Sequence, residues 1–348
     1  MSEAQLNAHP GSGRLDRPPP ESSYVDLPAS FGRRFAIFVD TEEEFDWSQP
    51  PTRDQHDTRA AESLPKVHRR LSAAGVKPVY LVDYPIASDP RCVATLRDYY
   101  EHGECTVGTQ LHPWVNPPMV EDLTRANSFA GNLSPALERA KLLNLTDLIE
   151  RSFDVRPTVY RAGRYGVGPN TARLLAEAGY EVDVSVRPLH DYRGEGGPDF
   201  SRHEARPFWA GDHGALLEVP LTVTYVGGLR RRGRALYPAA ARMPGAHGFL
   251  ARTGLLSRVA LTPEGMPLRD VSEAVERLLD DGTRLFSISF HSPSLEPGHT
   301  PYVRDEADLA LFYGWWDGMF ELFARRGVVP ASIEEIVAAA RAGRGAAL

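Results

Sequence analysis

The sequence predicts an α/β fold built from repeated strand and helix units. Short apolar runs rich in Val, Ile, Leu and Phe alternate with longer stretches in which apolar residues recur at spacings of three and four. This alternation is typical of parallel sheets, in which each helix carries the chain back to begin the next strand. Seven such units suit either a barrel or an open doubly wound sheet.

Seven strands are expected, and most are followed by a helix. The strands are residues 35–39, 79–82, 106–111, 158–160, 182–186, 216–219 and 285–290. The helices are residues 60–74, 89–102, 135–152, 170–178, 271–279, 309–323 and 332–342. Asp89 and Ser134 each precede a proline and are suited to begin their helices as N-caps. Gly75 and Gly179 follow two of the helices and are suited to end them.

Two stretches interrupt the alternation, and the N-terminus lies outside it. Residues 191–214 are rich in Gly, Pro and charge, and residues 227–267 are long and basic. We expect both to be insertions in loops after strands, the second with a short helix at 249–260. Residues 1–30 are polar and rich in Pro, Gly and Ser, which predicts a disordered tail. Residues 31–348 are then expected to form one barrel domain.

The composition excludes several classes of protein. The 348 residues are 42% hydrophobic and 24% charged, which permits a folded core, and the formal net charge is −7. No nucleic-acid partner is expected, because such proteins usually present a basic surface, and we interpret the arginine run at 230–234 as a solvated loop. No apolar run approaches the roughly 20 residues of a membrane span. Cys92 and Cys105 form no CxxC motif, and no secretory signal begins the chain, so a reduced, cytoplasmic setting is expected.

Chemically active side chains follow four of the expected strands. The first strand runs into Asp40 and Glu42, and the third runs into His112. The fourth strand runs into Arg161, and the last runs into His291. Because the carboxyl ends of parallel strands lie on one face, we expect these side chains to meet in one active site.

The segment after the first strand is unusually acidic, with five carboxylates within residues 40–46. Like charges at this density repel one another unless a cation lies among them. Asp40 and Glu42 alternate along an extended chain, so both can face one side, as a base beside a metal ligand. The alternative is a helix N-terminus, where acidic residues interact favourably with the helix dipole, and it weighs most for Glu43 and Glu44.

The other three residues each have a chemical and a structural interpretation. A lone histidine is more often structural than a ligand, but acids expected on the same face favour His112 as a metal ligand. Arg161 is suited to orient a carboxylate base, with a surface arginine as the alternative. His291 is suited to protonate a departing amine, with a buried, hydrogen-bonded histidine as the alternative.

These segments resemble the polysaccharide deacetylase family, which carries the NodB-homology domain and is also known as carbohydrate esterase family 4. Residues 40–42 (DTE) resemble its acidic first motif in a DxE form, and residues 108–114 (GTQLHPW) resemble its histidine motif. Residues 160–166 (YRAGRYG) and 289–292 (SFHS) resemble its arginine motif and its last histidine motif. The resemblance covers about residues 34–327. Residues 110–118 (QLHPWVNPP) and 291–303 (HSPSLEPGHTPYV) resemble one bacterial surface-polysaccharide branch of the family.

The resemblance implies a distorted (β/α)7 barrel and a hydrolase that removes N- or O-linked acetyl groups from a sugar or polysaccharide precursor, acting on carbon–nitrogen, non-peptide bonds. It implies that Asp40 is the base, that His291 is the acid and that Arg161 aligns the base. It also implies a divalent metal held by Glu42 and His112, expected to be Zn²⁺ with Co²⁺ or Ni²⁺ as alternatives.

A carbohydrate is the expected partner, and four aromatic residues are candidates to contact it. Trp47, Trp114 and Tyr302 are suited to stack on sugar rings, although core packing explains each equally well. A backbone N–H near Tyr165 is implied as the donor to the developing oxyanion. The sequence leaves the sugar, the metal and the oligomeric state open.

Three departures from the family pattern leave alternatives. Gln110 stands where the family has the first histidine of its second motif. Either Gln110 contributes to the metal site, or His299 or Glu43 completes it, or the metal is lost and the protein is an inactive glycan-binding barrel. Arg164 stands where the family has a tyrosine, and the fourth motif is weak, with Asp183 as its candidate. A small-amide hydrolase on the same barrel is a further alternative.

Overall fold

The structure, a computed structural model, describes residues 13–345 and is organised around one curled sheet. Its strands follow the order β10-β1-β2-β3-β4-β5-β7-β6, and β11 pairs with the beginning of β1. Every pair is parallel except β6 with β7. The strands are β1 (Arg33–Thr41), β2 (Val79–Val82), β3 (Thr106–Leu111), β4 (Val159–Ala162), β5 (Val182–Asp183), β6 (Phe208–Ala210), β7 (Leu216–Glu218), β10 (Leu285–His291) and β11 (Val328–Pro330).

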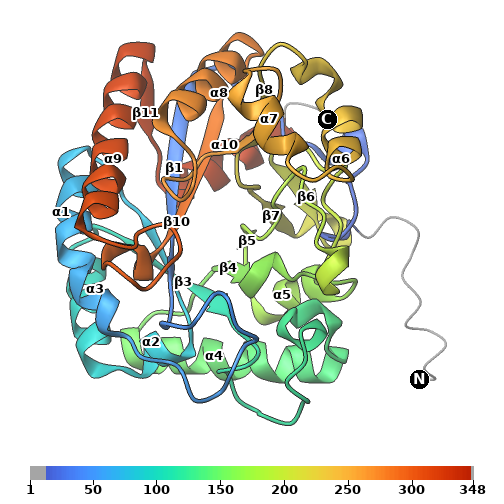
Figure 1. Cartoon of the computed structure of the whole chain (residues 1–348). Helices are drawn as coiled ribbons and strands as arrows, with labels where there is room; N and C mark the ends of the chain where they lie inside the picture. The colour runs from blue at the N-terminus through green and yellow to red at the C-terminus, as the bar shows by residue number, and fades with distance from the viewer. Residues whose placement is uncertain (1–12, 346–348) are drawn as a thin grey trace.

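Helices form a layer around the outside of the curled sheet (Figure 1). They are α1 (Leu64–Ala73), α2 (Tyr84–Ser88), α3 (Pro90–Glu101), α4 (Pro135–Phe153), α5 (Thr171–Ala178), α8 (Leu268–Asp280) and α9 (Glu306–Arg326). The last helix, α10 (Ile333–Gly345), packs instead against side chains on the inner face of the sheet. Asp89 and Ser134 cap α3 and α4 as predicted, by accepting hydrogen bonds from backbone N–H groups of their first turns. The predicted distorted barrel, with parallel strands inside and helices outside, is confirmed.

The alternation of side chains along β1 explains how the strand carries both a core and a site. Phe35 and Val39 pack outward with the surrounding helices, whereas Phe38 packs inward with residues of α10 such as Ile336. Asp40 lies two residues beyond Phe38 and therefore continues the inward-facing row at the carboxyl end of the strand. No described helix is both long and apolar enough to cross a membrane.

The barrel is not closed by pairing of its two terminal strands, β10 and β6. Instead the chain between β7 and α8 lies against β10: the N–H of Thr222 donates to the carbonyl of Ser287 over 3.1 Å, and the N–H of Ser289 donates to the carbonyl of Leu261 over 3.2 Å. This contact brings the residues just after Leu261, including Glu264, to the carboxyl end of β10.

The structure corrects several expectations about local structure. The helix predicted at 249–260 is present only in its first residues, as part of α7 (Ala246–Arg252), which follows α6 (Gly233–Ala240). The end of the predicted range is instead a strand, β9 (Ser257–Ala260), which pairs antiparallel with β8 (Val223–Val226). Apolar spacing alone did not separate a short strand from a helix end. The short strands β6 and β11 were not predicted, and β5 ends at Asp183, three residues earlier than expected.

The disordered tail predicted for residues 1–30 is wrong for the part that the structure describes. Leu15 is fully buried, and Tyr24 and Gly13 form isolated bridges with Phe208 and Gly211 near β6. The burial of Leu15 and these two backbone pairings hold a segment whose composition is otherwise typical of disorder. Residues 1–12 lie outside the described residues.

Candidate active site

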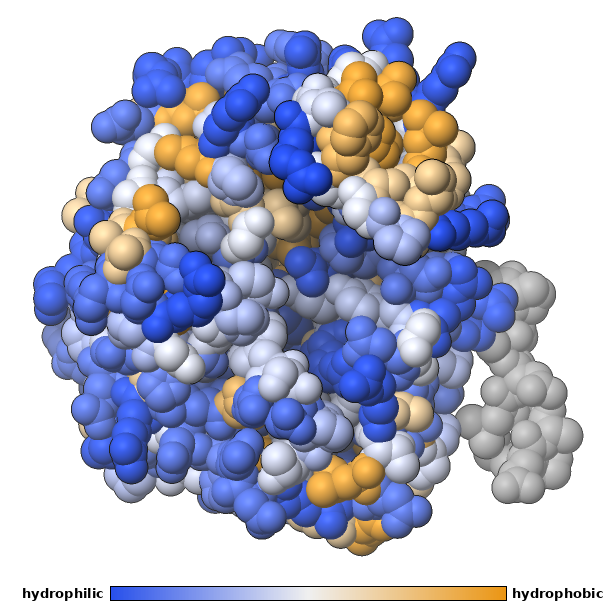
Figure 2. All heavy atoms as spheres, in the orientation of Figure 1, coloured by the Kyte–Doolittle hydropathy of each residue, from blue (hydrophilic) through white to orange (hydrophobic). Residues whose placement is uncertain are grey.

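A cavity of about 380 Å³ opens at the carboxyl ends of the strands, and Figure 2 shows this face hollowed near its centre. It is lined by the five residues predicted to follow the strands, which are Asp40, Glu42, His112, Arg161 and His291, and also by Gln110. They come from β1, β3, β4 and β10, or from the residues just after them. The predicted convergence therefore occurs, because neighbouring parallel strands are in register, with Asp40 opposite His291 and Gln110 opposite Arg161.

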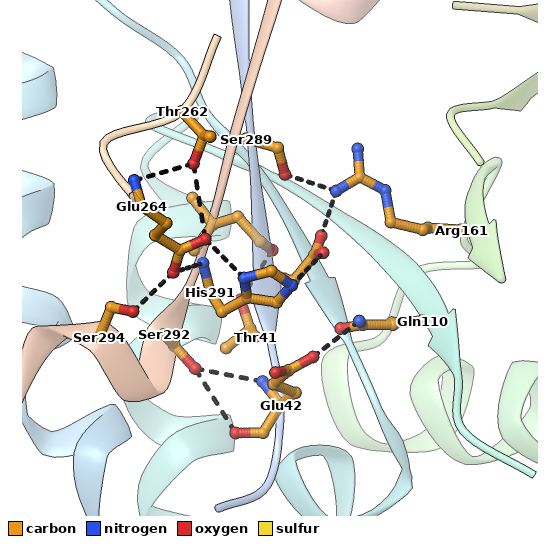
Figure 3. Close-up of polar contacts among 12 residues, drawn as sticks. Thr41, Glu42, Gln110, Arg161, Thr262, Glu264, Ser289, His291, Ser292 and Ser294 are labelled. Carbon is orange, nitrogen blue, oxygen red and sulfur yellow. Dashed lines mark hydrogen bonds and ion pairs between the residues drawn. The ribbon is translucent and has the colours of Figure 1, made fainter. Parts of the chain in front are cut away.

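Asp40 and Arg161 form a buried ion pair that lines this cavity. Figure 3 shows Arg161 with its second partner, Ser289, close to His291. Nη1 of Arg161 donates to Asp40 and to Ser289, and Nε donates to the carbonyl of Val184 over 3.1 Å. A buried guanidinium with three acceptors is held in one orientation, and it in turn orients the carboxylate. The surface-arginine alternative for Arg161 is excluded by this burial.

His291 lies between two carboxylates. Its Nε2 is 3.3 Å from Oδ2 of Asp40, and its Nδ1 is 2.7 Å from Oε2 of Glu264. Burial lowers the pKa of His291, but Glu264, Glu42 and Asp40 outweigh burial and raise this pKa to about 10. The ring is therefore charged near neutral pH, with one N–H held by Glu264 and the other facing Asp40 and the cavity.

Glu264 was not predicted as a site residue from the sequence, although it makes the closest contact to His291. Its Oε1 accepts from the backbone N–H of His291 over 3.0 Å and from the hydroxyl of Ser294 over 2.6 Å. Asp183, the earlier candidate for the fourth motif, instead accepts from Ser185 on the other side of the barrel. One signal was available, since Glu264 is the only acidic residue between Glu218 and Asp270.

Glu42, Gln110 and His112 form a second group in the same cavity. Nε2 of Gln110 donates to Oε2 of Glu42 over 2.8 Å, and Nε2 of His112 is 3.5 Å from the same oxygen. Oε1 of Glu42 and Oε1 of Gln110 are buried and have no hydrogen-bond partner among the described residues. Burial raises the pKa of Glu42 to about 8, although His291 and His112 oppose this rise.

A cation fits these residues. Two buried oxygens that lack donors are a cost that a cation would remove, and a carboxylate, an imidazole nitrogen and an amide oxygen are all donors to divalent metals. Asp40, Glu42 and His291 also bring side-chain N and O atoms within 4.8 Å of one another, but a protonated His291 ring has no free lone pair for a metal. A cation is therefore expected among Glu42, His112 and Gln110, with Asp40 close by.

Glu43 supports His112 from behind. Oε2 of Glu43 is 2.8 Å from Nδ1 of His112, and its Oε1 accepts from the indole N–H of Trp114 over 2.8 Å. Its backbone N–H donates to Asp83. A carboxylate on one ring nitrogen, which leaves the other nitrogen toward the cavity, is the usual support of a metal-binding histidine. Although Glu43, Asp83 and His112 also cluster, Glu43 and Asp83 do not line the cavity.

His299 and Trp114 occupy positions that differ from the predicted ones. Nδ1 of His299 is 2.9 Å from Glu44, and the two line a neighbouring hollow, so His299 does not complete the group around Glu42. Trp114 is only 2% exposed, and its N–H is taken by Glu43. Trp114 therefore supports Glu43, and because its ring also lines the cavity, its role in sugar stacking stays a prediction.

The other aromatic candidates lie along the cavity wall. The ring of Trp47 meets His291 edge-on with centroids 4.9 Å apart, and meets Tyr302 with centroids 5.8 Å apart. Tyr302 is 39% exposed, so its ring is available to a ligand. Together they form an apolar wall beside the charged floor, as carbohydrate sites require.

The loop after β4 has an unusual backbone. Arg164 and Tyr165 both have positive φ, at 56° and 59°. Residues other than glycine adopt this conformation at a cost of roughly 1–2 kcal/mol each, so two in succession are typical of a functional loop. The side chain of Arg164 binds Ser128 and Glu195, while the ring of Tyr165 lies 5.9 Å from the guanidinium of Arg161. The use of the Tyr165 backbone N–H as an oxyanion donor stays a prediction.

Comparison with solved structures identifies the fold. The chain is similar to a provisionally assigned polysaccharide deacetylase from Mycobacterium smegmatis, with a TM-score of 0.56 and 17% identity over 92% of this chain and 94% of that one. The chain has the fold of the polysaccharide deacetylases. The resemblance seen in the motifs is thereby confirmed for the architecture. No protein-family model and no curated protein sequence matches the chain.

The same fold also supports other reactions. The Puue allantoinase is similar with a TM-score of 0.50 and 14% identity, over 97% of this chain and 95% of that one. The 4-alpha-glucanotransferase from Thermococcus litoralis has a TM-score of 0.50 and 13% identity, over 88% of this chain but only 40% of that one. Because one fold serves these different reactions, the activity must be argued from the residues of the cavity.

Proposed function

We propose that this protein is a metal-dependent hydrolase that removes an N- or O-linked acetyl group from a carbohydrate. The observation that carries the proposal is the meeting of three groups in one cavity: a base held by an arginine, a protonated histidine held by a glutamate, and a glutamate–histidine–glutamine set with two unpartnered oxygens. Hydrolysis of an amide or ester needs a base, an acid and an electrophile in these places.

Glu42 and His112 would hold the metal, with the side-chain oxygen of Gln110 as the third donor. A divalent ion there, with Zn²⁺ preferred and Co²⁺ or Ni²⁺ as alternatives, supplies Lewis acidity that activates water and polarises the acetyl carbonyl. Glu43 orients His112 for this purpose. Gln110 must turn its amide for its oxygen to face the ion, since its nitrogen faces Glu42 here.

The remaining steps use side chains that the cavity already orients. Asp40 accepts a proton from a water molecule while the oxygen of that water attacks the acetyl carbon. Arg161 holds the Asp40 carboxylate aligned during that transfer. His291 then donates its proton to the nitrogen or oxygen of the sugar as the bond to the acetyl carbon breaks. The products are acetate and the free amine or hydroxyl of the sugar.

The size of the cavity supports a small reacting unit. A volume of about 380 Å³ is near the lower end for ligand sites and suits one or two sugar rings. Trp47 and Tyr302 give that unit an apolar wall. The same size supports the second candidate function, a small-amide hydrolase, because such an enzyme needs a confined pocket.

A substrate panel tests the proposal against its alternatives. Purified protein loaded with Zn²⁺, Co²⁺ or Ni²⁺ is assayed for acetate release from N-acetylglucosamine, chitooligosaccharides and O-acetylated sugars, and for ring opening of allantoin. Acetate release from a sugar is the expected result. Turnover of allantoin alone would favour the small-amide alternative. Activity gained only in Gln110→His would favour a barrel that binds glycans but has lost catalysis.

A further inference from the structure

Arg187 is a cation in the wall of the cavity without a carboxylate partner among the described residues. It lines the same cavity as Asp40 and His291, just after β5. Its Nη1 donates to the hydroxyl of Tyr192 over 3.1 Å, and its Nε is buried with no partner in the part of the chain that the structure describes. Its guanidinium carbon lies 5.0 Å from the centroid of Tyr165.

The other arginines around the cavity differ from Arg187. Arg161 is paired with Asp40, and Arg164 is paired with Glu195. Arg125 also lacks an ion pair among the described residues, but it is exposed to solvent at the rim. A half-buried guanidinium between the phenol groups of Tyr165 and Tyr192 loses part of its hydration without a compensating charge. A ligand with an anionic oxygen group would supply that charge and use the free donors.

We propose that Arg187 is a specificity residue and that the carbohydrate taken by this cavity carries an anionic oxygen group, a carboxylate or a phosphate. The guanidinium geometry matches both groups. The hydroxyls of Tyr192 and Tyr302, which line the same wall, are suited to donate to the anion beside Arg187. That the ligand is a carbohydrate rests on the proposed function. The test of this inference measures binding and not turnover.

Titration calorimetry on the Asp40→Asn protein tests this inference. The ligands are N-acetylglucosamine, the corresponding uronic acid (2-acetamido-2-deoxyglucuronate) and N-acetylglucosamine 1-phosphate. Tighter binding of either anion than of the neutral sugar is expected, and the preferred anion identifies the group. Arg187→Met should weaken binding of that anion about 10- to 100-fold and of the neutral sugar less than about twofold. Arg187→Lys should restore part of the loss.

Arg125→Met is the matched control, because it removes the same charge from the rim of the same cavity and should change anion binding little. Equal affinity for neutral and anionic sugars, or an equal loss of both in Arg187→Met, would overturn the inference. Selective binding of the anion without acetate release by the unmodified protein would leave the inference standing and reject the proposed function.

A separate observation concerns the basic hairpin, which we define as residues 227–256 between β8 and β9. It contains six arginines and no acidic residue, whereas the whole chain carries a net charge of −7. Five of these arginines form no ion pair with any described residue: Arg230, Arg231, Arg232, Arg242 and Arg252. Such segregation of charge attracts an anionic partner.

The outer surface of the basic hairpin also exposes large apolar side chains. Met243 and Phe249 are 66% and 59% exposed, and Leu229 and Leu255 are more than one-third exposed. Apolar residues gather where α6 and α7 lie (Figures 1 and 2). The inner face is satisfied separately, because Leu250 and its neighbours pack on β8 and β9. Arginines interleaved with uncovered apolar side chains are typical of a segment that rests on an anionic lipid surface.

We infer that the basic hairpin docks on anionic membranes as a peripheral contact. The full chain is sedimented with vesicles of phosphatidylcholine alone or mixed equally with phosphatidylglycerol. Binding only to the anionic vesicles is expected. The Arg230→Ser, Arg231→Ser, Arg232→Ser triple variant should bind about 100-fold more weakly, and Phe249→Ser about tenfold more weakly.

Matched controls exist elsewhere on the surface. Arg59→Ser, Arg69→Ser and Arg139→Ser together remove the same charge from exposed positions, and Leu311→Ser removes an apolar side chain that is 72% exposed. These variants should bind like the unmodified chain. Binding to neither vesicle, binding to RNA without vesicle binding, or a dimer that Phe249→Ser dissociates while vesicles are ignored would each overturn the inference.

Discussion

Glu264 contacts His291 at two points, through Nδ1 of the ring over 2.7 Å and through the backbone N–H over 3.0 Å. The contact joins residues that are 27 positions apart, on either side of α8. It fixes the ring with Nε2 toward Asp40, and together with Glu42 and Asp40 the Glu264 carboxylate raises the pKa of His291 against burial, so the ring keeps its proton. The protonated state that the proposed acid needs therefore depends on a residue outside the recognisable motifs.

Glu264→Gln should lower the pKa of His291, because burial then meets less opposition. A raised histidine pKa keeps the acid form available up to high pH, so the basic limb of the plot of kcat/KM against pH should move to lower pH in the variant. On the basic limb, kcat/KM falls roughly tenfold for each pH unit above the pKa of the acid. NMR titration of the His291 ring checks the same shift without activity. An unchanged limb and an unchanged titration would contradict this role, and Glu296→Gln on the following loop is the control.

Glu43→Gln should weaken metal binding about 10- to 100-fold, because the carboxylate orients His112 and increases the basicity of its ring. Competition with a chelator measures the affinity for Zn²⁺ directly. Glu62→Gln changes an exposed glutamate paired with Arg91 and should leave the affinity unchanged. Equal affinities in all three proteins would show that His112 is not a ligand.

Arg161→Met should lower the free energy of unfolding by about 3 kcal/mol, because it leaves the buried carboxylate of Asp40 with only His291 as a charged partner. Adding Asp40→Asn should recover much of that loss, since the unpaired charge is removed, while activity stays absent. Chemical denaturation measures both. Arg156→Met, which breaks an exposed pair with Glu150, should cost less than about 1 kcal/mol. Additive losses in the double variant would contradict the pairing.

Glu138 should make the fold less stable as the pH rises. Burial raises its pKa from 4.5 to about 7, and one of its oxygens lacks a partner among the described residues. The folded chain then holds this proton more tightly than the unfolded chain, so stability present below pH 4.5 is lost as the pH rises toward 7. Glu138→Gln should remove about 3 kcal/mol of this dependence. Thermal melts across this range check it, with the exposed Glu150→Gln as the control; parallel curves would contradict it.

Much of the fold followed from local signals in the sequence. The apolar run of β1, the N-caps Asp89 and Ser134, and the position of β3 depend on neighbouring residues alone, so they were predicted. One general rule, that parallel strands end on the same face of a sheet, predicted that Asp40, Arg161 and His291 lie close together. The geometry of that site needed no knowledge of long-range contacts.

The remainder depended on contacts that a sequence pattern does not contain. Glu264 reaches His291 only because Thr222 and Leu261 bind the free edge of β10 across the gap in the barrel. Trp114 donates to Glu43, which is 71 positions away in the chain, so the sequence offered only the aromatic character of Trp114, and that character suggested sugar binding. β9 was predicted as the end of a helix, because a four-residue segment is too short for its pattern of apolar and polar residues to distinguish a strand from a helix.

Acetate release by the metal-loaded protein, compared with Asp40→Asn, tests the central claim most directly. The proposed mechanism predicts release from an acetylated sugar that a chelator abolishes and that Asp40→Asn reduces at least about 100-fold, with Zn²⁺ still bound. Release that is equal in both proteins, or no bound metal and no acetate from any acetylated sugar, would contradict it.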